Sequence, residues 1–276
     1  MLLTEQNYYE KESNIEYCSA SQYKDFIGCP LRPGCEERAL KTITGEYQPE
    51  TTNAMLIGSI LDALWEGCNS EELADRFPDC VSTRGATKGE LKAEFKKAFV
   101  LYDRTIRDEK FKFYMSGEKQ VIMTGTIADL PFKIKMDSFM PCKAIIDLKT
   151  TENADMDFRV YIRDSGNRLP FYLAWNYDVQ LAIYREIVRQ NTGDILPCYI
   201  AAVDKKPHPK PCIINFETKV LDDALERVKI NCDKINALKH GDIEPVRCNS
   251  DECDYCRDNY ECVVLSTSEF EAHDDN

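Results

Sequence analysis

Three charged residues in the middle of the chain have a spacing that suits metal-assisted chemistry. Asp147 and Lys149 lie two positions apart in the run AIIDLKTT (144–151), whose apolar residues predict a β-strand. Successive side chains of a strand point to opposite faces, so these two project from one face, about 6.6 Å apart along the strand. Asp137 lies near the end of the preceding strand, where a suitable register brings its carboxylate beside that of Asp147.

Two carboxylates and an ammonium on one face of a sheet indicate chemistry at a phosphate. Oxygen ligands select Mg²⁺ or Mn²⁺ rather than zinc, and one or two such ions supply a nucleophilic water, neutralise the phosphate and help the leaving oxygen. The plainer alternative is an ordinary salt bridge between Asp147 and Lys149 on a solvent-facing surface. The strongly apolar residues around them favour a half-buried cleft.

Four segments predict the strands of the sheet that carries Asp147 and Lys149. Residues 132–151 predict a β-hairpin that turns at 141–143, and residues 121–128 predict a strand before it, so that the three strands form a meander. Residues 195–203 predict a buried strand, and residues 212–216 predict one more.

Two predicted helices carry polar residues that are candidates for the same site. The helix over residues 53–67 has Asp62 beside its apolar stripe, and an acidic residue four positions later shares its face. A solvated acidic face is the default for such a pair. The helix over residues 176–193 places Gln180 and Tyr184 on one face, because they are four positions apart.

This order of elements predicts one α/β domain over residues 1–276, with a mixed central β-sheet flanked by helices. We expect it to have a helical N-terminal part, in which residues 1–18 show little pattern, and a Cys-rich C-terminal segment. The expected regions are a mainly helical part (1–120), a core (121–240), a cysteine-rich segment (241–265) and an acidic tail (266–276).

The formal net charge is −13, from 35 Lys and Arg against 48 Asp and Glu, which argues against a broad basic face for nucleic acid. A local basic groove remains compatible with acidic outer faces. Residues 70–120 are rich in lysine and include a predicted amphipathic helix (88–109) and a basic patch (Lys110, Lys112 and Lys119). This region is either a solvated helical surface or one that follows a DNA backbone.

The sequence shows no secretion signal and no apolar run of membrane-spanning length, so we expect a soluble cytoplasmic protein without a membrane partner. Thirteen cysteines in such a chain favour buried thiols or metal binding over disulfides. Cys253 and Cys256 have a metal-ligand spacing, and Cys262 follows them; Cys29 completes one set of four. A rival quartet, which suits zinc or an iron–sulfur cluster, is Cys35, Cys248, Cys253 and Cys256.

The candidate residues also follow an order that resembles the PD-(D/E)xK nuclease superfamily, over roughly residues 19–262. The similarity is greatest to the RecB-like and λ-exonuclease branch, especially phage RecE-like exonucleases. It implies a restriction-endonuclease-like core. The residues that carry it are Gly58 and Asp62, then Asp137, then Asp147 and Lys149, and finally Gln180 and Tyr184.

The resemblance implies a role for each residue of the central pair of strands. Asp137 and Asp147 would bind the divalent metal together with the backbone carbonyl of Leu148. Lys149 would orient or activate the attacking water and stabilise the transition state.

The residues on the two helices have roles that follow from the same resemblance. Gln180 and Tyr184 would position the substrate strand or support the metal shell. Many RecB-like members have His where this chain has Asp62, and an Asp there is also a competent ligand for a hard metal.

The cysteines of the first quartet, Cys29, Cys253, Cys256 and Cys262, resemble the iron–sulfur staple of AddB-like and CRISPR-associated nucleases. That resemblance implies a 4Fe–4S cluster, which we prefer to Zn²⁺ as the expected occupant. Either metal would tie the end of the chain to its first helical loop. Reduced thiols without metal are the plainer alternative.

Together these features predict a Mg²⁺-dependent DNA exonuclease. The resemblance further implies action on linear duplex ends in phage-type recombination, a single-strand annealing protein as partner, possible homo-oligomers and a bacterial host cytoplasm. Two other classes stay open. One is a non-catalytic nucleic-acid-binding or assembly protein on a degenerate nuclease fold, and the other is a cysteine-cluster protein that regulates a partner.

Overall fold

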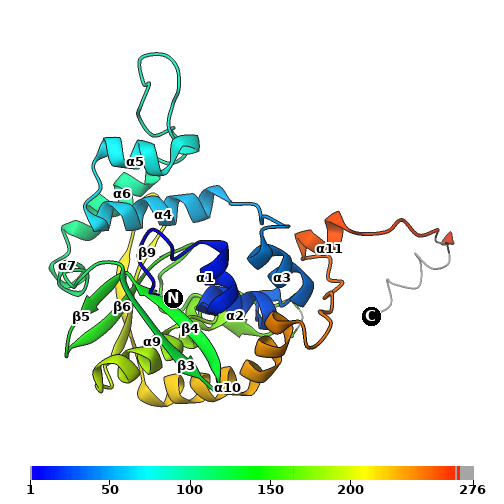
Figure 1. Ribbon diagram of the computed structural model, residues 1–276. Helices are drawn as coiled ribbons and strands as arrows, with labels where there is room; N and C mark the ends of the chain where they lie inside the picture. Colours follow the sequence, from blue (N-terminus) through cyan, green and yellow to red (C-terminus); the bar gives the residue numbers. More distant parts are fainter. Residues whose placement is uncertain (1, 164, 265, 268–276) are drawn as a thin grey trace.

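A four-stranded mixed sheet lies at the centre of the molecule (Figure 1). The coordinates are a computed structural model that describes residues 2–163, 165–264 and 266–267. The strand order is β10-β9-β6-β5; β6 and β9 run parallel, and each edge strand is antiparallel to its neighbour. The strands are β5 (Ser138–Met140), β6 (Ala144–Thr151), β9 (Cys198–Asp204) and β10 (Pro211–Phe216). The predicted α/β fold class is therefore confirmed.

Helices cover both faces of this sheet, which explains why its inner strands carry apolar residues on both faces. Ile145 of β6 packs in the cluster formed with α9 (Tyr177–Thr192) and α10 (Thr218–His240). Its neighbour Ile146 faces the other way, toward α4 (Asn53–Glu66), α6 (Lys97–Ile106) and α7 (Glu109–Tyr114). Since side chains alternate, Asp147 and Lys149 share the α9 face, as predicted from their spacing.

The predicted meander is wrong in one respect: its middle strand is broken at Asp137. β3 (Val121–Ile127) and β4 (Leu130–Met136) pair with each other in a separate two-stranded sheet, and an isolated bridge joins Phe132 of β4 to Cys18. The chain bends at Asp137, and β5 then pairs with β6, with Ser138 opposite Ile146. Extending this register by one residue places Asp137 opposite Asp147.

Both ends of α4 lie where the sequence predicts them. Thr52 caps the N-terminus by accepting a hydrogen bond from the Met55 amide, and Gly67 is the C-cap. The predicted helix over 88–109 is too long, because helix α6 begins only at Lys97. The chain before it turns at Gly89, whose φ of 85° is incompatible with a right-handed helix.

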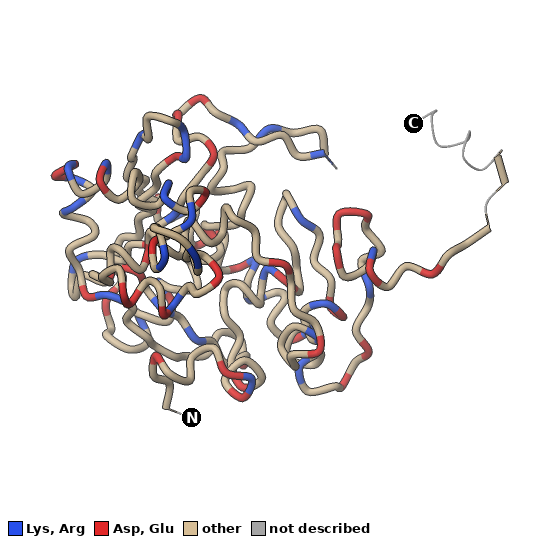
Figure 2. Tube along the Cα trace, turned by 90° about the horizontal axis from the view of Figure 1, so that it is seen from above, with Lys and Arg blue, Asp and Glu red and all other residues tan. Residues whose placement is uncertain are grey.

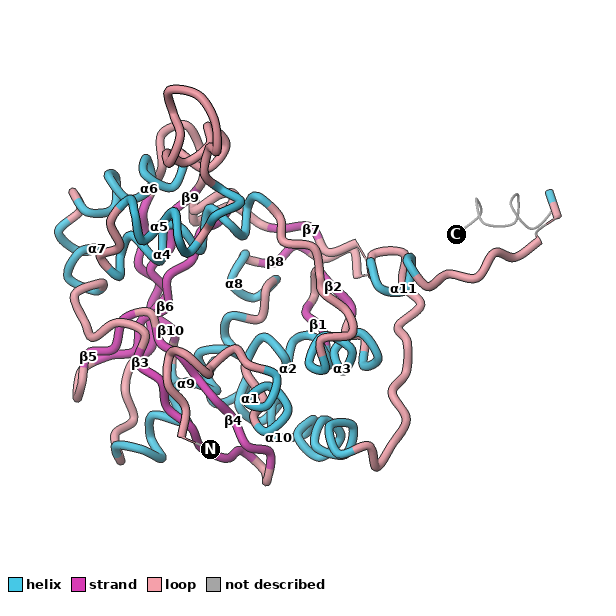
Figure 3. Tube along the Cα trace, turned by 45° about the horizontal axis from the view of Figure 1, so that its top comes forward, coloured by secondary structure: helices cyan, strands magenta, loops and turns pink. Residues whose placement is uncertain are grey.

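The remaining elements are short or peripheral. They are α1 (Lys11–Glu16), α2 (Ala20–Ile27), β1 (Gly28–Cys29), β2 (Arg32–Pro33), α3 (Glu36–Thr44), α5 (Ser70–Arg76), η1 (Pro78–Cys80), β7 (Val160–Tyr161), β8 (Arg168–Leu169), α8 (Phe171–Ala174) and α11 (Asp254–Asp258). Lys and Arg are interspersed with Asp and Glu along the trace (Figure 2). The segment after α10 returns to bring α11 beside α3 (Figure 3). Within the described ranges, no helix is long and apolar enough to cross a membrane.

Candidate active site

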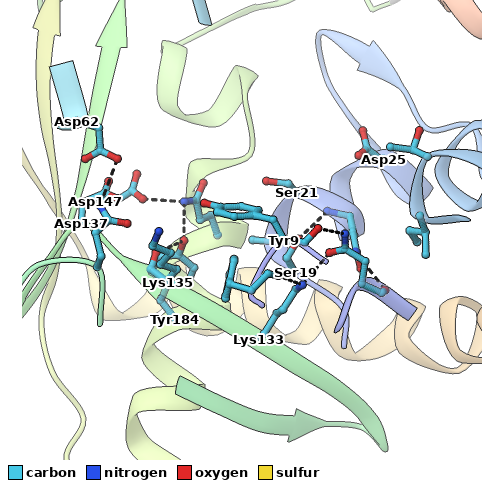
Figure 4. A pocket seen from close by; sticks show the side chains of 18 of the residues that line it. Tyr9, Ser19, Ser21, Asp25, Asp62, Lys133, Lys135, Asp137, Asp147 and Tyr184 are labelled. Atoms are coloured by element: carbon cyan, nitrogen blue, oxygen red, sulfur yellow. Dashed lines mark hydrogen bonds between the residues drawn. The ribbon is translucent and has the colours of Figure 1, made fainter. Parts of the chain in front are cut away.

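One cavity of about 330 Å³ is lined by every side chain that the sequence proposed for catalysis (Figure 4). The residues come from α4, from the bend between β4 and β5, from β6 and from α9. They are Asp62, Asp137, Asp147, Lys149, Gln180 and Tyr184. The fold thus gathers residues that are up to 122 positions apart in the chain (184 minus 62).

Asp147 is held in place by a relay of hydrogen bonds from α9. It is 2% exposed, and its Oδ1 accepts a hydrogen bond of 2.7 Å from Gln180 Nε2. The same nitrogen donates to the Tyr184 hydroxyl at 3.1 Å, and that hydroxyl donates to the Lys135 carbonyl at 3.1 Å. Gln180 and Tyr184 therefore orient the carboxylate of Asp147.

Asp137 is fastened to the same strand through the main chain. Its Oδ2 accepts a hydrogen bond of 2.7 Å from the amide of Leu148. The N–H and C=O groups of one strand residue point to the same side, so the Leu148 carbonyl also faces the edge that Asp137 occupies. Asp62 lies beside the pair (Figure 4), where its Oδ2 accepts from Gln120 Nε2 at 3.3 Å.

These side chains fit a hard divalent cation. Asp147 Oδ2 is buried, and the ammonium of Lys149 forms an ion pair with it. The donor set is three carboxylates and the carbonyl of Leu148, all of them oxygen ligands of the kind that Mg²⁺ and Mn²⁺ prefer. The arrangement leaves negative charge that a cation would neutralise.

Burial and neighbouring charges shift the pKa values of the groups in the cavity. Burial raises the pKa of Asp137 well above its usual range, and the carboxylates of Asp62 and Asp147 add to the effect. Burial likewise raises the pKa of Asp62 to about 6, with Glu66 contributing. For Lys149, burial opposes the charged form, but Asp147 and Asp137 outweigh it and raise the pKa, so the side chain stays an ammonium.

We expect the ionisation of Asp62 to destabilise the protein when no divalent cation is bound. Its folded-state pKa of about 6 exceeds the ordinary 3.8, so the stabilising contribution of the protonated form is complete below about 4 and is lost as the pH rises through 6. The free energy of unfolding of Asp62→Asn, relative to that of the wild type, should therefore increase by on the order of 1–3 kcal/mol between pH 4 and 7. Thermal unfolding in Mg²⁺-free buffer measures this difference. A difference that stays constant over this range would contradict the assignment.

The N-terminal segment forms one wall of the cavity, and no sequence pattern predicted it. Tyr8 and Tyr9 line it, and the ammonium of Lys135 lies 5.2 Å from the centroid of the Tyr9 ring. Lys133, which is only 1% exposed, donates to the Tyr8 carbonyl and to Asn14 Oδ1. One sequence feature could have indicated this segment: Lys133 and Lys135 lie on one face of an otherwise apolar strand. Buried lysines need polar partners, which another part of the chain must supply.

Basic side chains surround the acidic centre despite the net charge of −13. The ammonium groups of Lys24 and Lys149 lie 5.4 and 5.2 Å from the centroid of the Tyr177 ring. Burial and then Lys149 lower the pKa of Lys24 to about 8. Lys119 lies close enough for Asp137 and Asp62 to affect its pKa, which burial lowers. Three basic side chains, those of Lys133, Lys135 and Lys149, line the cavity itself.

A family model described as "PDDEXK-like domain of unknown function (DUF3799)" matches residues 19–259. The chain belongs to this family. The DUF3799 domain thus has a PDDEXK-like nuclease fold, and the predicted membership of the PD-(D/E)xK superfamily is confirmed. A crystal structure from Eubacterium rectale, described as a "Putative exonuclease", is 41% identical to the chain, covers 99% of each chain and superposes with a TM-score of 0.88. No curated protein matches the chain.

The cysteines differ from the preferred prediction. The structure gathers the rival quartet, Cys35, Cys248, Cys253 and Cys256, whose sulfurs all lie within 4.8 Å of one another. Cys29 and Cys262 are not members of this group. Cys29 precedes the turn of the β1–β2 hairpin, which carries the chain on to Cys35 at the start of α3, and Cys262 is exposed beyond α11.

Proposed function

We propose that this DUF3799 protein is a Mg²⁺- or Mn²⁺-dependent DNA exonuclease that hydrolyses phosphodiester bonds at the ends of linear duplex DNA. The observation that carries the proposal is the cavity in which Asp137, Asp147 and Lys149 meet, with the Oδ2 atom of Asp147 buried against the ammonium of Lys149. The E. rectale protein, described as a putative exonuclease, supports the choice of exonuclease.

The geometry favours catalysis over simple binding of nucleic acid. A module that only binds DNA needs basic and aromatic groups, and carboxylates beside them would repel each phosphate. Here Asp62, Asp137 and Asp147 lie at the centre of the cavity, with basic side chains around them. This arrangement suits a phosphate that arrives with a divalent cation, and it gives no advantage to a non-catalytic module.

Each residue then has a distinct task. Asp137, Asp147 and the Leu148 carbonyl would hold the cation, and Asp62 would complete its shell. When bound, the ion would neutralise the scissile phosphate and lower the pKa of the attacking water. Lys149, which its acidic neighbours keep protonated, acts as a cation on the phosphate oxygens rather than as a general base.

The test is cleavage of end-labelled linear duplex DNA with Mg²⁺, compared with a covalently closed circle of the same sequence. We expect progressive shortening of the linear DNA, no cleavage of the circle and no reaction when Mg²⁺ is omitted. Cleavage of the circle at the same rate would refute the requirement for an end. No cleavage of either substrate with Mg²⁺ or Mn²⁺ would refute the nuclease itself.

We further propose that this activity serves phage-type recombination in the cytoplasm of a bacterial host, with a single-strand annealing protein as partner and a possible homo-oligomer. The resemblance of the residue series to phage RecE-like exonucleases supports this role. Co-purification with a candidate annealing protein would test it.

We also expect Tyr9 to contact the DNA. Its ring is 71% exposed at the cavity wall, close to Lys135, where it can stack on a base near the scissile phosphate. Stacking contributes about 1–3 kcal/mol per base, so Tyr9→Ala should raise KM roughly 5- to 100-fold with little change in kcat. Tyr9→Phe should behave as wild type. The control is Tyr260→Ala, since Tyr260 is 68% exposed on the C-terminal segment; an equal effect of the two alanine variants would exclude this contact.

A further inference from the structure

A second group of potential metal ligands lies outside the cavity, where the C-terminal segment meets α3 (Figure 3). The sulfurs of Cys35 and Cys256 are 3.8 Å apart, and those of Cys248 and Cys256 are 3.6 Å apart. Cys35, Cys253 and Cys256 are buried, Cys248 is half-buried, and all four are free thiols in the described chain. Four thiols gathered this closely offer a complete set of ligands to one ion.

The spacing of the sulfurs distinguishes between the two metals. Around one zinc ion with Zn–S bonds of about 2.3 Å, a tetrahedron places its sulfurs about 3.8 Å apart. In a 4Fe–4S cluster each cysteine binds a different iron at an outer corner of a cube, so its four sulfurs are spread much more widely. The observed separations, at most 4.8 Å, match a single ion.

A buried arginine gives independent evidence for negative charge at this cluster. Arg38 of α3 is 6% exposed, and its Nη1 donates to Cys253 Sγ at 3.6 Å. Its Nη2 is buried and has no hydrogen-bond partner among the described residues; its nearest acidic atom is Asp25 Oδ1 at 3.7 Å. Neutral thiols would leave this guanidinium poorly compensated, whereas four thiolates on a divalent ion carry a net charge of −2.

We propose that Cys35, Cys248, Cys253 and Cys256 form a tetrahedral structural zinc site, in place of the iron–sulfur centre that the family resemblance implies. The site has four protein ligands and no open position, so its role is to join segments rather than to catalyse. It fastens the end of the chain to the N-terminus of α3. Glu37 reinforces the junction by accepting hydrogen bonds from the Tyr255 hydroxyl and from Arg247.

This junction lies behind one wall of the candidate active site. Ala39, Thr42 and Ile43 of α3 line the cavity, and so does Asp25 of α2, which pairs with Arg38. Loss of the zinc would free α3 from the C-terminal segment. We therefore expect it to lower the thermal stability and, if the proposed nuclease function holds, to raise KM for DNA more than it lowers kcat.

The direct test is the metal content of the full chain purified without oxygen from cells supplied with both zinc and iron. We expect about one zinc per chain, little iron or sulfide and no broad visible absorption. Protein purified from cells grown with Co²⁺ should show the ligand-field spectrum of a tetrahedral tetrathiolate site. Four irons with matching sulfide, or a protein that binds neither zinc nor cobalt, would overturn the proposal.

Matched cysteine variants separate the two quartets. Cys256→Ser should reduce the zinc content at least several-fold, whereas Cys29→Ser and Cys262→Ser should retain it. If Cys256→Ser does not fold, the Cys29 and Cys262 variants still decide the matter, because loss of zinc from either one would refute the assigned ligands. Asp147→Asn should keep its zinc even when inactive, so failure of the nuclease proposal and failure of the zinc proposal give different results.

Discussion

Replacing Asp147 by Asn is expected to slow phosphodiester hydrolysis by about 10³-fold or more without unfolding the protein. The amide keeps the shape of the side chain and can still accept the hydrogen bond from Gln180. It loses the charge that a divalent cation needs, and a bound cation supplies several kcal/mol of transition-state stabilisation, which corresponds to this factor. The measurement is the single-turnover rate on end-labelled linear duplex with Mg²⁺.

The control for this variant is Asp129→Asn. Asp129 is exposed in the turn between β3 and β4, and its φ of 63° is one that Asn tolerates. This substitution removes the same charge from the same region of the chain and should leave the rate unchanged. A wild-type rate in Asp147→Asn would remove Asp147 from the proposed mechanism.

The second large effect is expected for Lys149→Met, which keeps most of the length of the side chain and removes the ammonium. We expect the single-turnover rate at saturating DNA to fall roughly 10²- to 10³-fold, because a cation aimed at the developing charge is lost. Metal affinity should not fall, since the ammonium that pairs with Asp147 no longer competes with the ion. Titration with Mn²⁺ measures this second quantity.

Lys143→Met is the matched control, because Lys143 is exposed in the turn between β5 and β6. It should cleave DNA as fast as the wild type. Should Lys149→Met lose its affinity for Mn²⁺ and keep its rate once saturated with metal, Lys149 would be a structural partner of Asp147 and not a group that acts on the phosphate.

The parts of the site that local patterns define were predictable from the sequence. The alternation of β6 places Asp147 and Lys149 on one face, and the spacing of four in α9 places Gln180 and Tyr184 together. These relations depend only on the geometry of one element. The sequence therefore predicted that each of these two pairs shares one face of its own element.

The parts that depend on contacts between distant segments were not predictable in this way. The break at Asp137 arises because β4 pairs with β3 while β5 pairs with β6, which the residue pattern of a single hairpin does not reveal. Tyr9 lines the cavity next to Tyr8, whose carbonyl accepts a hydrogen bond from the distant Lys133. The choice of Cys35 over Cys29 depends on where the β1–β2 hairpin turns and on where α3 begins.

The central claim is that Asp137, at the bend before β5, and Asp147 of β6 bind a catalytic ion together. Its most direct test is an anomalous difference map from crystals soaked in Mn²⁺. We predict a manganese peak in contact with the carboxylates of Asp137 and Asp147 and with the Leu148 carbonyl, at about 2.0–2.3 Å, and no such peak in Asp147→Asn. A well-diffracting wild-type crystal with no manganese at these atoms, or with manganese only elsewhere, would contradict the account.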